Sequence, residues 1–199
     1  MTIQISVIGL GQIGTSIGLA LKNHAEIVQR TGFDRDPEIA RQAEHQGAFD
    51  RITNSLVQAI READLVILAL PMDQIREALQ VVAMNLNTGG VVMDTGPVKE
   101  IVATWAKELL PKERYYSGLT PVINPTYLYT AESGLEAAHA DLFKGGMMAI
   151  VTPSNASPEA VKLAADLTRI LGATALFIDP LEIDSLMAAT HLLPQIIAA

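Results

Sequence analysis

The sequence predicts an α/β fold in which a doubly wound, mostly parallel sheet is covered by helices. Short apolar runs typical of strands alternate with longer segments of helical period, which is the pattern of successive βαβ units. One run, residues 64–70 (DLVILAL), is apolar on consecutive positions, as expected for a parallel strand covered on both faces. With 199 residues, 49% of them hydrophobic, the chain has room for one domain and the beginning of a second.

The individual elements follow from these runs in chain order. The predicted strands are residues 3–9, 28–34, 64–70, 90–95, 115–119, 147–152 and 174–179. The predicted helices are residues 12–22, 37–46, 55–63, 73–85, 98–110, 131–142 and 158–171. Three helix starts carry a capping residue followed by proline and then glutamate, with Asp36, Ser157 and Asp179 as the expected N-caps.

Two segments depart from this regular alternation. Residues 120–131 (TPVINPTYLYTA) contain two prolines and clustered tyrosines, so we predict an irregular loop there, which is either functional or a plain surface excursion. Residues 184–199 have a helical pattern and are strongly apolar. An apolar helix has to pack against another surface, so we interpret this end as a truncation point or as part of an association surface.

Composition and charge exclude several classes of protein. The formal net charge is −8 and there is no long basic run, which argues against binding to nucleic acid or to an anionic membrane surface. No apolar stretch approaches the roughly 20 residues of a spanning helix, and the start of the chain lacks a secretory signal pattern. The absence of cysteine excludes disulfides, thiolate metal sites and a cysteine nucleophile. We expect a cytoplasmic protein without a metal site.

A glycine-rich turn after the first predicted strand indicates a nucleotide site. Gly9, Gly11 and Gly14 have the spacing GxGxxG between a strand and an amphipathic helix, and Asp34 ends the next strand 20 residues beyond Gly14. In a Rossmann-type domain these glycines allow the tight turn, the approach of a pyrophosphate and close helix packing, while the carboxylate accepts hydrogen bonds from the ribose. The alternative is a structural turn with a coincidental N-cap aspartate.

The same aspartate bears on the choice of cofactor. A carboxylate at Asp34 would repel the 2′-phosphate of NADP and therefore favours NAD. Arg35 follows directly and offers a cation for a 2′-phosphate or a cover for adenine, so NADP stays possible.

Five stretches carry a more specific pattern: GLGQIGTSIGLALK (9–22), ADLVILALPMDQI (63–75), VVMDTGPVKE (91–100), SGLEAAHADLFKGGMMAIVTP (133–153) and THLLPQIIAA (190–199). Together they resemble the prephenate and arogenate dehydrogenases of tyrosine biosynthesis. That resemblance implies oxidative decarboxylation of an anionic small-molecule substrate, a hydroxylated cyclohexadienyl carboxylate, with hydride transfer to the nicotinamide. It also implies a dinucleotide-binding domain at residues 1–179, a C-terminal helical dimerisation domain beginning at 180–199, and a homodimer in the full-length form.

Carried over residue by residue, the resemblance implies a cofactor site and a substrate site. The cofactor-binding residues it implies are Gly9, Leu10, Gly11, Gln12, Ile13, Gly14, Asp34, Arg35, Leu70, Pro71 and Thr95. The implied catalytic positions are Thr120 and His191. The alternative for His191 is an ordinary helix histidine without a role in substrate binding. Lys99 is expected to be a solvated lysine at a helix start, and Asp94 to cap or brace the turn before it.

Several substrate-side positions differ from the family pattern. Pro97 stands where the family has a serine, Thr120 where it has the histidine of a Gly-x-His-Pro motif, and Gln195 where it has a second histidine on the terminal helix. A threonine donates and accepts a hydrogen bond but is no general base near neutral pH. Three interpretations therefore stay open: a dehydrogenase of the prephenate/arogenate type, acting on the family's substrates or on another hydroxylated carboxylate; a catalytically inactive nucleotide-binding sensor or scaffold; or an oxidoreductase of the β-hydroxyacid type.

Overall fold

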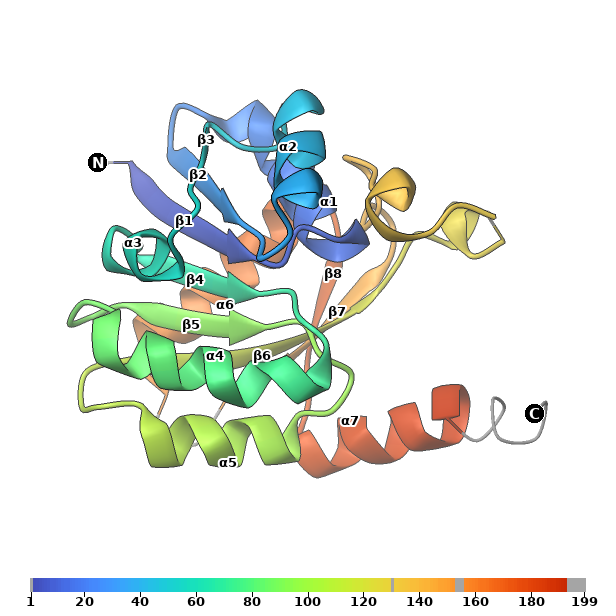
Figure 1. The fold of residues 1–199 in the computed structure, drawn as a ribbon. Coiled ribbons are helices and arrows are strands. Elements are labelled where there is room, and N and C mark those ends of the chain that lie inside the picture. The colour runs from blue at the N-terminus through green and yellow to red at the C-terminus, as the bar shows by residue number, and fades with distance from the viewer. Residues whose placement is uncertain (1, 130, 153–155, 193–199) are drawn as a thin grey trace.

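The computed structural model describes residues 2–129, 131–152 and 156–192. Of residues 191 and 192 it describes the backbone alone. Its centre is an eight-stranded sheet with the order β3-β2-β1-β4-β5-β6-β7-β8 (Figure 1). The strands are β1 (Ile3–Ile8), β2 (Val28–Phe33), β3 (Arg51–Ile52), β4 (Leu65–Leu68), β5 (Val91–Asp94), β6 (Tyr115–Val122), β7 (Met147–Val151) and β8 (Thr174–Phe177). The first six strands in this order are parallel, whereas β7 runs antiparallel to β6 and parallel to β8. The predicted doubly wound, mostly parallel sheet is confirmed.

Helices cover both faces of this sheet. They are α1 (Gln12–Leu21), α2 (Pro37–His45), α3 (Leu56–Arg61), α4 (Met72–Asn85), α5 (Glu100–Leu109), α6 (Pro158–Ile170) and α7 (Pro180–Met187), which a π-helical turn, Ala188–Leu192, continues. Helices α4 and α5 lie on the near face in Figure 1 and α6 lies behind the sheet. No helix in the described part of the chain is long and apolar enough to cross a membrane.

Consecutive residues of the central strands enter different cores. Leu65 and Ile67 of β4 join the cluster that contains residues of α1, α2 and α6, whereas Val66 and Leu68 join the cluster of α3, α4 and α5. A strand sends alternate side chains to opposite faces, so burial on both faces requires apolar residues at every position. This explains why the unbroken apolar run at 64–70 predicts a central strand correctly.

Local capping signals place the helix starts as predicted. The side chains of Asp36, Ser157 and Asp179 accept hydrogen bonds from the backbone N–H groups of Glu38, Ala160 and Leu181, and a proline follows each of them. These side chains satisfy amide hydrogens that the first helical turn leaves unpaired. The short strand β3 is the element that the sequence reading missed, because two residues carry no periodic signal.

The prediction of a helix at residues 131–142 is wrong. Only a 3₁₀ turn, η3 (Gly134–Ala137), forms within it, and Gly134 has a φ of +62°. The segment instead bonds to α1, since Gln12 Nε2 donates to the carbonyl of Ala137 at 3.1 Å and the His139 N–H donates to Ser16 Oγ at 3.0 Å. Tertiary hydrogen bonds of this kind compete with helical ones in a way that residue periodicity does not reveal.

The predicted irregular stretch at 120–131 is only partly irregular. Its first residues extend β6 to Val122, and a 3₁₀ turn, η2 (Pro125–Tyr127), follows. The Tyr127 ring stacks on His139, with centroids 4.2 Å apart. The β6–β7 connection is therefore folded back on itself beside the start of α1.

An ion pair between the buried Arg30 and the exposed Asp50 joins β2 to the chain around it. Arg30 is 4% exposed, and its guanidinium donates to the carbonyls of Gly18 and Ala48 at 2.9 and 3.0 Å and to Asp50 Oδ1 at 2.6 Å. Hydrogen bonds from Arg30 hold the pKa of Asp50 below its ordinary value, although partial burial opposes this shift. The free energy of unfolding therefore depends on whether the Asp50 carboxyl is ionised.

We expect Asp50→Asn to lower the free energy of unfolding by about 2 kcal/mol at pH 7, because the Arg30 guanidinium stays buried without its carboxylate. The folded-state pKa of Asp50 is lowered, so its contribution is complete above the ordinary value of 3.8 and is lost as the pH falls through the folded-state pKa. Urea denaturation at a series of pH values should therefore show the two proteins converging at acid pH. A difference independent of pH would contradict this assignment.

Candidate functional site

The turn between β1 and α1 is built so tightly that two positions require glycine. Gly9 has a φ of +90°, and a Cβ added to it would lie 2.4 Å from the carbonyl oxygen of Ala69. A Cβ on Gly14 would lie 1.9 Å from the carbonyl oxygen of Gly9. A Cβ on Gly11, in contrast, would meet nothing within 4 Å, so open space borders the backbone there. The helix begins directly at the carboxyl edge of the sheet.

The first turn of α1 presents unused backbone donors. No side chain caps the helix at Gly11, and the first helical hydrogen bond runs from the Thr15 N–H to the carbonyl of Gly11. Within the described residues, the N–H groups of Gly11, Gln12 and Ile13 form no hydrogen bond. Free amides at the positive end of a helix, beside open space, fit a phosphate group.

Asp34 lies at the end of β2 and braces this turn. Its Oδ2 accepts a hydrogen bond from the Leu10 N–H at 2.8 Å, and its Oδ1 accepts one from the Asp36 N–H at 2.9 Å. Each carboxylate oxygen still has a lone pair available for a further donor. The sequence predicted a carboxylate for ribose hydroxyls at this position but not its second contact, with the glycine turn.

A cavity of about 480 Å³ opens where β1, β2 and β4 end. This is the point at which the strand order reverses, and open α/β sheets bind ligands there. Six of the predicted cofactor residues line the cavity: Gly9, Gly11, Asp34, Arg35, Leu70 and Pro71. The other predicted positions, Leu10, Gln12, Ile13, Gly14 and Thr95, do not line it.

Those remaining positions have other surroundings. The Leu10 side chain is fully buried in the core, and Ile13 packs against the same core. Gln12 holds Ala137 through its side chain, while Thr95 follows β5 and donates its N–H to the carbonyl of Leu68 at 3.0 Å. Only the Gln12 and Ile13 backbone amides stay open to a ligand among these.

The sequence reading missed the wall of the cavity that α4 supplies. Gln74, Glu77, Ala78 and Val81 line it from one face of that helix. Their spacing of three and four residues is the signal that could have identified them, once the helix after β4 is recognised as the neighbour of the strand-order reversal.

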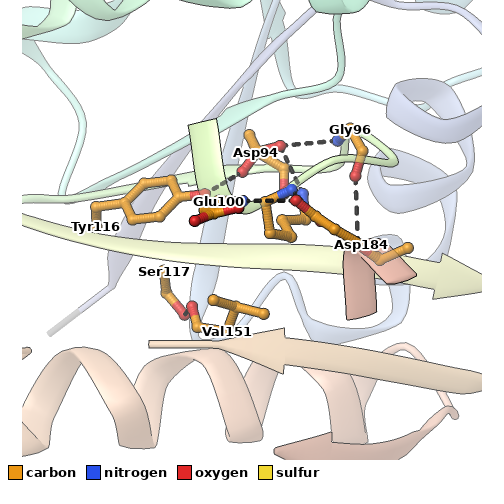
Figure 2. A network of polar contacts seen from close by, with 9 residues as sticks. Asp94, Gly96, Glu100, Tyr116, Ser117, Val151 and Asp184 are labelled. Atoms are coloured by element: carbon orange, nitrogen blue, oxygen red, sulfur yellow. Dashed lines mark hydrogen bonds and ion pairs between the residues drawn. The ribbon is translucent and has the colours of Figure 1, made fainter. Parts of the chain in front are cut away.

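A second polar cluster lies at the carboxyl end of β5, against the first half of β6. Asp94 is fully buried, and Figure 2 shows its carboxylate at the centre of this cluster. Its Oδ1 accepts hydrogen bonds from Lys99 Nζ at 2.6 Å and from the Gly96 N–H at 2.9 Å. Its Oδ2 accepts the Tyr116 hydroxyl at 2.6 Å. The expectation that Asp94 braces the turn agrees with these contacts.

Lys99 is completely buried, so the expectation of a solvated lysine at the helix start is wrong. Its side chain runs from the start of α5 to Asp94 because that carboxylate would otherwise lie in the core without a counter-ion. Burial lowers the pKa of Lys99, and Asp94 opposes the shift. Burial and the same carboxylate raise the pKa of Tyr116 well above 10, so the hydroxyl stays a donor.

The cluster reaches Thr120 through the backbone of the turn. Thr120 is 3% exposed, and its Oγ1 donates to the carbonyl of Gly96 at 3.3 Å. Pro97, which follows Gly96, is exposed and has no N–H to donate. The Thr120 hydroxyl therefore lies against the turn whose Gly96 N–H Asp94 holds.

Helix α7 connects to the same cluster. Asp184 accepts the N–H groups of Lys99 and Glu100 at 2.6 and 3.0 Å, so a carboxylate of α7 caps the start of α5 (Figure 2). His191 belongs to the turn that continues α7; its side chain and all of Gln195 lie outside the described part of the structure. No group of three or more potential metal ligands occurs among the described residues.

Comparison with known proteins identifies relatives along nearly the whole chain. The family model for the nucleotide-binding domain of prephenate dehydrogenase matches residues 17–176. A cyclohexadienyl dehydrogenase of Zymomonas mobilis is 27% identical over 98% of this chain and 64% of its own length, and a prephenate dehydrogenase of Bacillus subtilis is 28% identical over 98% and 52%. The chain thus spans between about half and two thirds of these relatives.

Solved structures have the same fold. The prephenate dehydrogenase of Aquifex aeolicus, in complex with hydroxyphenyl propionate and NAD+, matches with a TM-score of 0.88 and 22% identity, over 100% of this chain and 67% of that one. At 22% identity this similarity establishes a shared fold and not a shared substrate.

We expect Tyr116→Phe to lower the free energy of unfolding by about 2 kcal/mol, because it removes a hydrogen bond to a buried carboxylate. Tyr115→Phe is the matched control, since the neighbouring hydroxyl forms no hydrogen bond within the described residues, and it should change stability by less than about 0.5 kcal/mol. Chemical denaturation of both variants measures the difference. Equal effects would contradict the central place of Asp94.

Proposed function

Because this chain belongs to the prephenate dehydrogenase family, we propose that it binds NAD+ in the cavity beside the β1–α1 turn and supports oxidative decarboxylation in tyrosine biosynthesis. The substrate is a hydroxylated cyclohexadienyl carboxylate, and the full-length protein is a cytoplasmic homodimer. The single observation that supports this most is that the free amides of Gly11, Gln12 and Ile13 lie at the start of α1, next to a cavity that Gly11 and the carboxylate of Asp34 line.

The chain's own groups account for binding and orientation of a dinucleotide. The free amides of α1 receive the pyrophosphate, and Asp34 receives the ribose hydroxyls through its spare lone pairs. Ile39, Leu56 and Val81 offer an apolar slot for the adenine. Glu77 adds a second carboxylate to the lining, which disfavours the extra phosphate of NADP.

The substrate is proposed to lie at the ends of β5 and β6. When bound there, an oxidised nicotinamide accepts the hydride that leaves the ring carbon bearing the hydroxyl, while the ring carboxylate departs as CO2 and its bonding electrons complete the aromatic ring. Thr120 orients the substrate hydroxyl by a hydrogen bond, and the buried Asp94–Lys99 pair holds the turn that carries Gly96. A threonine hydroxyl is no general base near neutral pH, so the role proposed for Thr120 is to position the substrate hydroxyl.

A second function has an observation in its favour. Neither Pro97 nor Thr120 carries a titrating group, whereas the free amides of α1 and the carboxylate of Asp34 are present at the proposed cofactor site. A nucleotide-binding sensor or scaffold without dehydrogenase activity would have this combination. A dehydrogenase acting on another hydroxylated carboxylate is consistent with it as well.

NADH should bind more tightly than NADPH. We expect Asp34→Asn to reduce this preference by about tenfold, because it removes the charge that repels the 2′-phosphate while an amide oxygen can still accept the Leu10 N–H. Glu38→Gln removes one charge from the neighbouring helix and serves as the control. Titration by nicotinamide fluorescence gives both dissociation constants. Equal affinity of the wild-type protein for the two cofactors would exclude the proposed role of Asp34.

Prephenate and arogenate should be turned over with NAD+, and Thr120→Val should lower kcat by about tenfold through loss of one hydrogen bond. Thr120→Ser, which keeps the hydroxyl, should retain most of the activity. Cofactor reduction is followed at constant substrate, with other 2- and 3-hydroxyacids tested in parallel. Tight NADH binding without turnover of any substrate would favour the sensor, and full activity of Thr120→Val would remove Thr120 from the mechanism.

A further inference from the structure

A second cavity, of about 330 Å³, lies at the opposite end of the sheet from the cofactor cavity. It opens where α5 ends and β6 begins, at the edge from which the parallel strands start. We call it the basic hollow and define it by Lys107, Lys112, Glu113, Arg114, Tyr115 and Tyr116. Its volume suits a small molecule rather than a dinucleotide.

The charge of the basic hollow contrasts with that of the chain. Three cations and one carboxylate line it, a net of +2, whereas the whole protein carries −8. None of Lys107, Lys112 and Arg114 has a carboxylate oxygen within 4.0 Å among the described residues, although Arg30, Arg41, Arg51, Lys162 and Arg169 do. Glu113 also lines the hollow but forms no ion pair with these three cations among the described residues, so the lining keeps a net positive charge.

One of the three cations is held in place. Arg114 is half-buried, its Nε donates to the carbonyl of Leu86 at 3.1 Å and its Nη1 donates to the carbonyl of Lys112 at 3.2 Å. Its Nη2 forms no hydrogen bond within the described residues. A fixed guanidinium with an unused donor loses little conformational entropy when an anion binds, unlike a free surface lysine.

We propose that the basic hollow binds a small anion with two or more negative charges, of the phosphate or dicarboxylate class. Arg114 supplies an ordered donor, and Lys107 and Lys112 are exposed and adjust around the anion. The site is independent of the proposed cofactor cavity, because β5 and β6 run between the two edges. Tyr116 extends from the basic hollow to Asp94, so one side chain contacts both regions.

The test follows backbone amide resonances of the ¹⁵N-labelled chain during titration with sodium phosphate and, separately, sodium malonate at constant ionic strength. We expect saturable shifts at residues 107–116 with a dissociation constant in the millimolar range. Lys107→Ala combined with Lys112→Ala should weaken binding about tenfold, at about threefold for each exposed charge. Lys144→Ala, which removes an exposed cation from the opposite edge of the sheet, should leave it unchanged.

The outcomes separate the ligand classes and the two cavities. Saturation by phosphate alone indicates a phosphoryl ligand, and saturation by malonate alone indicates a carboxylate ligand; each supports the site. Shifts at residues 11–13 report on the cofactor cavity only, so failure of one proposal does not affect the other. Linear shifts at 107–116, an absence of shifts, or an equal loss of affinity in Lys144→Ala would overturn the basic hollow as an anion site.

Discussion

The buried carboxylate of Asp94 is the constraint on which the edge of the sheet proposed to hold the substrate depends. A charge in this position has to be matched, and Lys99, the Gly96 amide and the Tyr116 hydroxyl match it within 3 Å. Each partner belongs to a different piece of the chain, so satisfying one carboxylate also fixes the turn after β5, the start of α5 and the side of β6. Asp184 extends the same constraint to α7 by capping α5.

The cofactor edge is constrained by steric contact instead of charge. Gly9 lets the turn pack against the backbone of Ala69, and Gly14 lets α1 pack against Gly9 and Val7. The first amides of α1 are unpaired because a helix start has no preceding turn whose carbonyls could accept them. Asp34 then has two tasks, because it holds the Leu10 amide and faces the cavity. Because Asp34, the carboxylate proposed to bind the dinucleotide, also holds the Leu10 amide, the turn is ordered before the dinucleotide binds. This order lowers the conformational entropy lost on binding.

What the sequence predicted, and what it did not, follows from the range of the interactions. The strands around 64–70, the N-caps at Asp36 and Ser157 and the glycine turn depend on neighbours within a few residues, so their patterns are visible in the sequence. Lys99 is buried by a partner on another element, and residues 131–142 avoid a helix by bonding to α1. Such contacts form only after the sheet assembles, and a linear pattern does not contain them.

The two edges therefore differ in how a change of residue affects them. The proposed cofactor cavity is lined by Gly9 and Gly11 and by side chains of β2, α4 and the segment after β4, and the β1–α1 turn beside it requires glycine at positions 9 and 14. The substrate edge is defined by side chains standing on a backbone that Asp94 and Lys99 hold in place. Neither Thr120 nor Pro97 takes part in the buried Asp94–Lys99 ion pair, so a change of side chain at either position leaves that pair intact. Chemistry at this edge can change while dinucleotide binding is kept, and a fold match alone therefore does not define the reaction.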